Sequence, residues 1–265
     1  MSFARSYARE PPLPRFAARE LALWALVYPL YLAIRGWSIG STGEAIGDAW
    51  RVIHLERALG LFHEAALQRA VEGADDLFSV YYMLGFAPLV VAVLIWLGVR
   101  RRDRYRELRT LMFTSLALAT IGYVAYPTAP PRLVPGLGID DTVGLSQGHD
   151  GGSFLGIRFD PYAAMPSMHV GWGLLIALVC FRATSSRWVR GALVVHPALM
   201  TFAVTATGNH YFADSAAGIA AALLALGLVS AFRAVRRRRS PPPERSWAET
   251  ATVTAWTADR DRRAA

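Results

Sequence analysis

The stretch Leu84–Val99 reads LGFAPLVVAVLIWLGV and contains no charged residue. A second stretch of the same kind is Gly218–Val229 (GIAAALLALGLV). Of the 265 residues 54% are hydrophobic and only 18% are charged, whereas about a quarter of the residues of a soluble domain are usually charged. This composition excludes an ordinary soluble globule, a disordered chain and a coiled coil. It favours one helical membrane domain with terminal tails.

A membrane-spanning helix needs about 20 mostly apolar residues, and six segments of the chain meet this requirement. They are residues 20–36, 78–99, 110–127, 167–181, 189–207 and 211–232. We therefore predict an all-α fold, an integral membrane bundle of six transmembrane helices over residues 20–232. The N-terminal tail is then 1–19, and the Arg/Pro-rich tail 233–265 is expected to be disordered.

The distribution of positive charge predicts how these helices are oriented. All 28 basic residues are arginine, and the net charge is +8. Most of the arginines lie in the two tails and in the loops after the second and fourth spans, so arginine-rich and arginine-poor segments alternate with every crossing. Because arginine-rich loops stay in the cytoplasm, we predict a cell-membrane protein with both termini cytoplasmic, no cleaved signal peptide and no nucleic-acid partner.

Two long segments are expected on the extracytoplasmic side. Residues 37–77 have Ile46, Trp50 and Ile53 at helical spacing, which predicts one or two amphipathic helices lying on the membrane surface. Residues 128–166 are rich in glycine and proline, and a long irregular loop of this kind is commonly a lid or a binding loop.

Four polar residues at the outer ends of the spans are candidates for a functional site. His169 starts the fourth span, and His210 and Asp214 start the sixth. The i, i+4 spacing of His210 and Asp214 places both side chains on one helix face, where the carboxylate can fix one imidazole nitrogen and leave the other as a base or nucleophile. Arg132 ends the segment Tyr126–Arg132 (YPTAPPR) at the outer end of the third span. These residues predict a shared site at the outer membrane interface.

Two motifs carry a resemblance to a known family. Met165–His169 (MPSMH) and Gly208–Asp214 (GNHYFAD) resemble the two histidine motifs of the phosphatidic acid phosphatase type 2 superfamily. The chain is most similar to the inositol phosphorylceramide synthase-like branch of that superfamily, the inositolphosphotransferases. The resemblance covers about residues 78–232 and the layout of six spans.

The resemblance implies a metal-independent phosphotransferase or phosphohydrolase that needs no cofactor and acts on a lipid phosphate in the bilayer. It implies that His210 is the nucleophile of a phosphohistidine intermediate, that Asp214 orients it and that His169 is the general acid and base. Water or an alcohol such as inositol would accept the phosphoryl group. We expect Arg132 and the backbone near Ser167 to bind the phosphate, since a helix N-terminus and an arginine both favour anions.

The chain also departs from the lipid phosphatases of the superfamily, which have a Lys-x6-Arg-Pro motif and a Ser-Arg pair. The corresponding positions hold Ala125, Leu133, Ala203 and Val204. A phosphate site with fewer fixed cations is therefore expected, and Arg158 is a candidate for a second cation.

Three alternatives stay open beside this hypothesis. His169, His210 and Asp214 could form a catalytic zinc site, because three ligands and a water are a common zinc pattern. The same cluster could serve a proton-coupled or metal-dependent membrane transporter. Gly144–Gly148 (GLSQG) matches the Gly-x-Ser-x-Gly pattern of hydrolases, but no strand precedes it, which argues against that chemistry.

Overall fold

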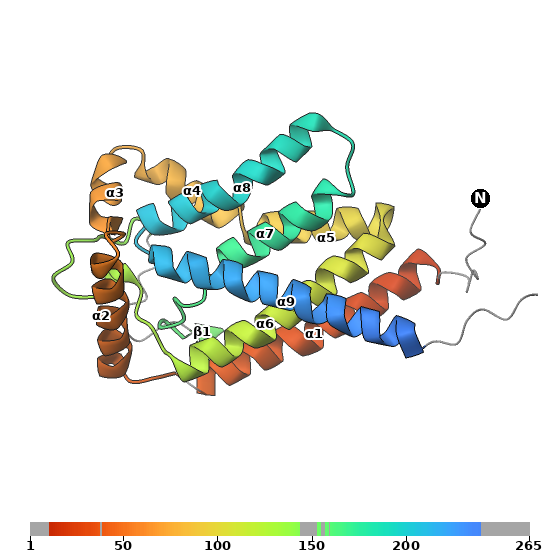
Figure 1. Ribbon diagram of the computed structural model, residues 1–265, viewed down its shortest axis with the longest axis horizontal. Helices are drawn as coiled ribbons and strands as arrows, with labels where there is room; N and C mark the ends of the chain where they lie inside the picture. Colours follow the sequence, from red (N-terminus) through yellow and green to blue (C-terminus); the bar gives the residue numbers. More distant parts are fainter. Residues whose placement is uncertain (1–10, 38, 144–152, 155–156, 159, 240–265) are drawn as a thin grey trace, which may run out of the picture. The chain divides into compact units, whose positions relative to one another are not determined.

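The computed structural model describes residues 11–37, 39–143, 153–154, 157–158 and 160–239, and most of these residues are helical (Figure 1). The all-α prediction is confirmed, apart from a two-residue antiparallel ladder. The chain divides into two compact units, 1–229 and 230–265. The elements are α1 (Leu13–Trp37), α2 (Thr42–Ala58), α3 (Glu64–Ala70), α4 (Asp75–Leu84), α5 (Ala87–Arg100), α6 (Arg102–Ala125), η1 (Pro131–Leu133), β1 (Ser153–Phe154), β2 (Ile157–Arg158), α7 (Met168–Phe181), α8 (Arg187–Ala206) and α9 (Phe212–Arg239).

Five helical segments among the described residues are long and apolar enough to cross a membrane. They are α1, the α4–α5 segment Asp75–Arg100, α6, α8 and α9. The predicted fourth span, α7, is apolar but has only 14 residues. At 1.5 Å per residue it is about 21 Å long, shorter than the roughly 30 Å hydrocarbon core. The presence of several spans is thus supported by the structure, and the sixth span stays a prediction.

The boundaries of two predicted spans differ in the structure. α1 begins at Leu13 rather than at residue 20, and it continues through Pro29 as one helix. The predicted span 78–99 is broken into α4 and α5 between Leu84 and Ala87. Pro88 has no N–H group to donate to the carbonyl of Leu84, so the helical hydrogen-bond ladder is interrupted there.

Residues 37–77 contain α2 and α3, and Figure 1 shows α2 standing across the run of α6 and α9 at one end of these helices. The buried face of α2 includes Ala45, Ala49, Val52 and Ile53. The sequence predicted one apolar face that contains Ile46, Trp50 and Ile53. In the structure Ile53 is buried, whereas Ile46 and Trp50 are only half-buried. Small alanines at 45 and 49 allow close packing, and the Ala45 carbonyl accepts a hydrogen bond from the Ala129 amide at 3.1 Å.

The helix α7 is the centre of the main hydrophobic core. Ten of its 14 residues are buried, which explains why its sequence is apolar on every side. Its neighbours include α6 and α8. Trp172 of α7 donates a hydrogen bond from its indole N–H to the Ser115 hydroxyl of α6 at 3.2 Å, so the polar end of this buried ring is satisfied.

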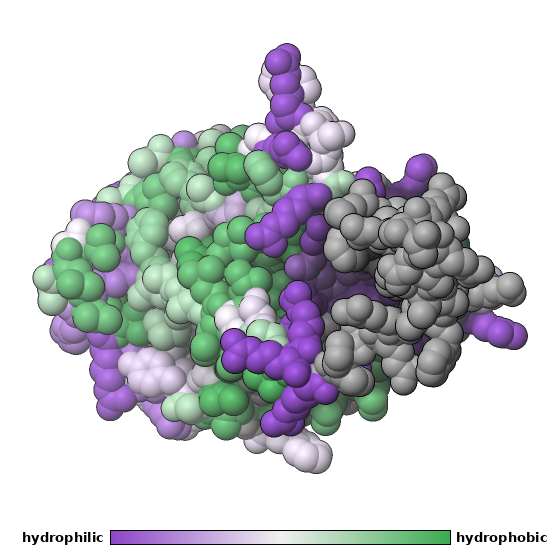
Figure 2. Space-filling view, turned by 45° about the vertical axis from the view of Figure 1, so that its right-hand side comes forward, coloured by the Kyte–Doolittle hydropathy of each residue, from purple (hydrophilic) through white to green (hydrophobic). Residues whose placement is uncertain are grey.

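The outer faces of the long helices are apolar, as expected for helices in contact with lipid. Each of the five candidate spans exposes large hydrophobic side chains, for example Leu21, Ile95, Ile121, Val194 and Leu223. Figure 2 shows apolar residues covering a broad area of the visible surface, with hydrophilic residues beside it. An exposed apolar area of this extent is typical of a surface covered by another apolar phase.

The Gly/Pro-rich segment 128–166 is anchored at both ends. The Thr128 amide donates to the Tyr162 carbonyl at 2.7 Å, and the Ala164 amide donates to the Thr128 carbonyl at 3.3 Å. In between, β1 and β2 pair Ser153 with Arg158. The Gly144–Gly148 motif lies outside the described residues.

The second unit begins at residue 230, and its described part is the C-terminal end of α9, which continues to Arg239. Residues 233–239 of the predicted tail are therefore helical in the structure. This end contains four consecutive arginines, 236–239, and arginine is a good helix former that also interacts favourably with a helix C-terminus. Residues 240–265 of the predicted disordered tail lie outside the described residues.

Candidate active site

His210 and Asp214 form a hydrogen-bonded pair at the start of α9. His210 Nδ1 lies 3.2 Å from Asp214 Oδ2, and the same oxygen accepts a bond from the Tyr211 amide at 2.9 Å. Asp214 is fully buried and His210 is nearly so. With its Nδ1–H donated to the carboxylate, the imidazole keeps Nε2 as its basic nitrogen. This arrangement suits a nucleophile or a general base.

His169 lies opposite His210. The two ring centroids are 5.5 Å apart, at an interplanar angle of 60°. The His169 ring is stacked on Tyr82 of α4, with centroids 4.7 Å apart, and its centroid is 4.1 Å from that of Phe86. Phe86 occupies the break between α4 and α5, so this break places an aromatic wall behind the imidazole. The structure thus brings the two predicted histidines together.

Backbone contacts fix the distance between α7 and α9. The Ser167 amide, which precedes α7, donates to the Asp214 carbonyl at 2.9 Å. Gly218 of α9 packs directly on the Ser167 carbonyl, where an added Cβ would collide with the oxygen. On the other side of α7, the Tyr123 hydroxyl donates to the Pro166 carbonyl at 2.8 Å.

Ser167 itself has an unusual environment. Its side chain is completely buried, and within the described part of the chain its hydroxyl has no hydrogen-bond partner. Buried hydroxyls normally have a partner, and this one caps neither Met168 nor any later residue of α7. A buried hydroxyl beside a helix N-terminus is a suitable environment for the oxygen of an anion.

Arg132 reaches the loop that carries His210. Its Nη1 donates to Asn209 Oδ1 at 2.6 Å, its amide donates to the Gly208 carbonyl at 3.1 Å, and its Nε lies 3.6 Å from Asp141 Oδ2. Burial lowers the pKa of Arg132, and the charge of Asp141 opposes this effect. Arg132 thus binds Asn209, the residue that precedes His210, and Asp141 compensates part of its charge.

The third predicted phosphate ligand, Arg158, is placed only by its backbone. It lies in β2, and its side chain is outside what the structure describes. The structure therefore brings together His169, His210, Asp214, Ser167 and Arg132, and it leaves the place of the Arg158 guanidinium open.

Two glutamates that the sequence analysis did not select hold the start of α9. Glu64 Oε1 accepts a bond from the Phe212 amide at 3.3 Å, and Glu56 Oε1 accepts one from the Ala213 amide at 2.6 Å. Together with Asp214, three carboxyl groups accept bonds from three consecutive amides, those of residues 211–213, where α9 begins. Both glutamates are buried, which is rare for this residue type and was not visible in the sequence pattern of α2 and α3.

Burial raises the pKa of Glu56 to about 9, and a hydrogen bond with Glu64 adds to the effect. The negative charge of Asp214 acts in the same direction. Glu56 is therefore protonated at neutral pH and can donate its proton to Glu64. Such a shared proton lets two buried carboxyl groups lie side by side.

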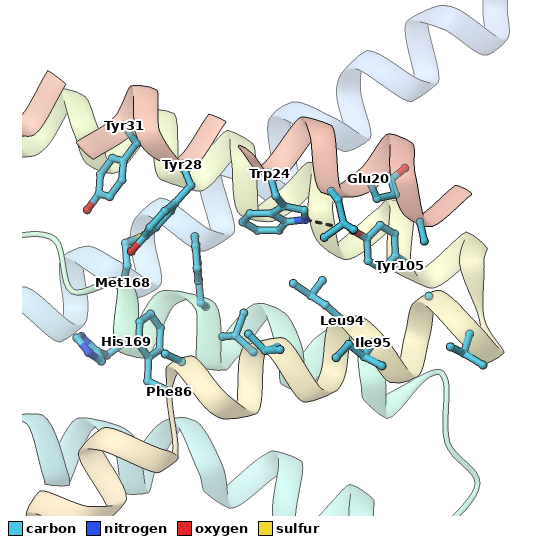
Figure 3. Close-up of a pocket in the computed structure, with 18 of the residues that line it drawn as sticks. Glu20, Trp24, Tyr28, Tyr31, Phe86, Leu94, Ile95, Tyr105, Met168 and His169 are labelled. Atoms are coloured by element: carbon cyan, nitrogen blue, oxygen red, sulfur yellow. Dashed lines mark hydrogen bonds between the residues drawn. The ribbon is translucent and has the colours of Figure 1, made fainter. Parts of the chain in front are cut away.

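A cavity of about 860 Å³ extends from the two histidines along α1 and α5. Figure 3 shows Glu20, Trp24, Tyr28 and Tyr31 following one another along α1, with His169 near the Tyr31 end. The walls of the cavity are mostly apolar residues of α1, α5, α6 and α7. Glu20 lies at the other end, where it binds Arg109 Nη1 at 2.6 Å. The cavity is thus a long apolar groove with the histidines at one end.

The described residues contain no group of three histidine, cysteine or acidic side chains placed to hold a metal ion. In particular, Asp214 Oδ2 is already bound to the His210 ring and to a backbone amide.

A comparison with protein families supports the resemblance drawn from the two histidine motifs. A family model described as the PAP2 superfamily matches residues 50–228, more than half of the chain. The chain belongs to the PAP2 superfamily. No curated protein and no solved structure matches it. PAP2 membership supports phosphatase or phosphotransferase activity, and it gives no support to a transporter.

The limits of the PAP2 match are informative. The matched segment contains both histidines, Asp214 and the two glutamates that bind the start of α9. It begins after α1, so this helix and the side of the groove that it forms lie outside the match. Features of α1 are therefore features of this chain and not of the matched family segment.

Proposed function

We propose that this protein is an integral membrane phosphotransferase or phosphohydrolase that transfers the phosphoryl group of a lipid phosphate through a phosphohistidine at His210. The observation that carries the proposal is the position of two histidines and a buried aspartate at one end of a long apolar groove. The groove can hold the acyl chain of a lipid, and the two histidines can transfer a phosphoryl group in two steps.

The proposed reaction has two steps. In the first, His210 Nε2 attacks phosphorus, the bond to the lipid alcohol breaks, and His169 gives a proton to the departing oxygen. In the second, His169 takes a proton from the acceptor, whose oxygen attacks phosphorus and releases His210. Asp214 holds the Nδ1 proton of His210 throughout and stabilises the charge that forms on the ring.

The phosphate oxygens need positive groups during both steps. The N-terminus of α7 supplies partial positive charge through its first amides, and the unpartnered Ser167 hydroxyl can donate to an oxygen. Arg132 contributes charge from the other side of His210. We propose these groups as the phosphate site, which stabilises the charge that develops in the transition state.

The lipid chain would occupy the groove between α1 and α5. Each CH₂ group removed from water contributes about 0.8 kcal/mol, but a chain that moves from the bilayer into a groove gains much less. The groove therefore positions the head group at the histidines more than it adds affinity. A substrate that stays in the bilayer needs only to move sideways to reach this site.

We further propose that α7 crosses the membrane as a sixth span, with both termini in the cytoplasm and the site at the extracytoplasmic face. The arginine-rich ends of the spans support this orientation. α2 and α3 would then lie at the outer surface above the site.

Water and an alcohol are both compatible with the second step. The lack of the Lys-x6-Arg-Pro and Ser-Arg motifs agrees with the inositolphosphotransferase branch, so we propose transfer to an alcohol such as inositol, or the transfer of an inositol phosphate, as the activity of this site.

The test uses the purified full chain in lipid nanodiscs with a panel of phosphate monoester and diester lipids, with and without inositol. A new phosphate ester of the acceptor is expected for a transferase, and inorganic phosphate alone for a hydrolase. Rapid quench in an alkaline denaturant should trap a labelled enzyme whose label is stable in base and lost in acid, as phosphohistidine is. Absence of turnover with every lipid phosphate, or full turnover by His210→Ala, would contradict the proposal.

A further inference from the structure

Arg35, near the end of α1, lines the same cavity as His169 and His210. We propose that Arg35 is the second cation of this site and that it binds the phosphate of a lipid whose chain occupies the groove. The inference rests on the proposed function, because it assigns a ligand group within the same site. It replaces Arg158 in the role that the sequence suggested.

The position of Arg35 links it to the start of α7. Its guanidinium carbon lies 5.0 Å from the centroid of the Tyr123 ring, and the hydroxyl of that ring binds the carbonyl of Pro166. Pro166 directly precedes Ser167. Tyr123 therefore contacts both Arg35 and the residue before Ser167, and both Tyr123 and Arg35 line the cavity.

The guanidinium is held in place by its neighbours. Nη1 donates to the Tyr31 hydroxyl at 2.6 Å, and Nη2 donates to the Asp160 carbonyl at 2.9 Å. A planar guanidinium in a fixed orientation can bind two oxygens of a phosphate with little loss of side-chain entropy. Its side chain is 19% exposed, and the residue lines the cavity.

The guanidinium of Arg35 forms an ion pair with the carboxylate of Asp160. Asp160 Oδ2 lies 3.7 Å from Arg35 Nε, beyond hydrogen-bond distance, and Asp160 Oδ1 accepts a bond from the Tyr162 amide at 2.8 Å. Burial raises the pKa of Asp160, and the charge of Arg35 opposes this effect. A phosphate with two negative charges can therefore compete with a single, more distant carboxylate for the guanidinium.

A second cation would complement Arg132 at this site. Ala125 and Val204 stand where the lipid phosphatases of the superfamily have lysine and arginine, and Arg132 is already bound by Asn209 and Asp141. The family match begins after α1, so it does not bear on a cation on this helix.

The experiment measures lipid binding in the absence of turnover, in the full chain with His210→Ala. Phosphatidic acid and diacylglycerol with the same acyl chains differ only in the phosphate, so the ratio of their dissociation constants reports binding of that group. Arg35→Gln should weaken the binding of phosphatidic acid by about 10-fold or more, as expected for a lost charged hydrogen bond, and leave diacylglycerol unchanged. Arg35→Lys should restore part of the loss.

Two controls separate this effect from a structural one. Arg35→Gln combined with Asp160→Asn removes both charges of the pair, and it should show the same selective loss. Arg109→Gln combined with Glu20→Gln removes a pair of similar exposure at the other end of the groove, and it should change the binding of neither lipid selectively. Arg158→Gln should bind phosphatidic acid as the parent does.

A competition arm with inorganic phosphate distinguishes the free ion from the lipid head group. Weaker competition in Arg35→Gln means that the ion alone reaches Arg35, and unchanged competition means that only the lipid-bound phosphate does. Equal losses for both lipids, no loss in Arg35→Gln, or a loss in Arg158→Gln instead would overturn the inference. These results do not depend on turnover, so they differ from a failure of the proposed function, which would appear as absent product.

Discussion

Glu56 Oε1 accepts a hydrogen bond from the Ala213 amide at 2.6 Å, which connects α2 to the first turn of α9. The helix that carries Asp214 is thus held by a carboxyl group more than 150 residues away in the sequence. Because His210 directly precedes this turn, the orientation of its ring depends on α2 as well as on α9.

Glu56 should make the stability of the protein pH-dependent. Its pKa is raised from 4.5 to about 9 in the folded state, so between these values the folded state binds more protons than the unfolded state. The free energy of unfolding should therefore fall as pH rises across this window. Glu56→Gln cannot ionise and should flatten this dependence, as measured by thermal unfolding in detergent between pH 5 and about pH 9.

Glu56→Ala serves as the contrasting variant, since it removes the acceptor for the Ala213 amide. Loss of a helix-capping acceptor should cost about 1–2 kcal/mol at every pH and reduce turnover by misplacing His210. An unfolding temperature of Glu56→Gln that falls with pH as steeply as in the wild type would show that this carboxyl group is not the source.

His169→Ala should slow the release of lipid alcohols by about 10²–10⁴-fold, because a general acid contributes that much to the departure of a poor leaving group. With a nitrophenyl phosphate, whose leaving group is already acidic, the loss should be much smaller. His210→Ala should abolish turnover of both. If the acid-labile label persists in His210→Ala and disappears in His169→Ala, the two roles are reversed.

Asp214→Asn should keep the fold and lose activity. Both bonds end on Asp214 Oδ2, so an asparagine with its oxygen there keeps them but has no negative charge to stabilise the charged His210 ring, and one with its NH₂ group there can accept neither. A loss of up to about 10⁴-fold is known for the corresponding change in other enzymes. Circular dichroism checks the fold. Near-normal rates for this variant would remove Asp214 from the mechanism.

Activity should survive EDTA. The described residues offer no cluster of three metal-ligating side chains, and the proposed reaction needs no metal ion. Initial rates after dialysis against the chelator, with and without added zinc or magnesium, provide the measurement. Loss of activity that zinc restores would favour the metal site instead.

The arginine distribution makes a prediction about topology. A reporter fused after Arg104 should be cytoplasmic, and one inserted near Gly144 should be extracytoplasmic, because an odd number of spans is predicted between them. Alkaline phosphatase and green fluorescent protein fusions read the two sides. Both reporters on the same side would contradict the proposed orientation and the extracytoplasmic site.

The sequence predicts the helices well where composition alone determines them. Apolar runs locate α6, α8 and α9, and the i, i+4 spacing of His210 and Asp214 indicates their hydrogen bond. It does not reveal the break between α4 and α5, since Leu84–Val99 is apolar throughout and the break depends on the missing amide of Pro88. The sequence does not indicate that α9 extends to Arg239, because the arginines after residue 232 were assigned to the C-terminal tail.

Long-range contacts account for the rest of what the sequence does not show. Glu56 and Glu64 have the spacing of solvated helix residues, and only the approach of α9 buries them. Arg35 ends an apolar run that also suits a simple membrane-interface anchor. Its relation to His210 depends on the packing of α1 beside α6 and α7, which no local pattern encodes.

The contact between Gly218 and the Ser167 carbonyl has a consequence for how this enzyme could change its substrate. The spacing of the two histidines is set by main-chain atoms of α7 and α9, whereas the groove is shaped by side chains of α1 and α5. Substitutions along the groove can therefore alter which lipid is accepted while the reacting groups keep their separation. Selectivity and chemistry can evolve, or be engineered, independently of each other.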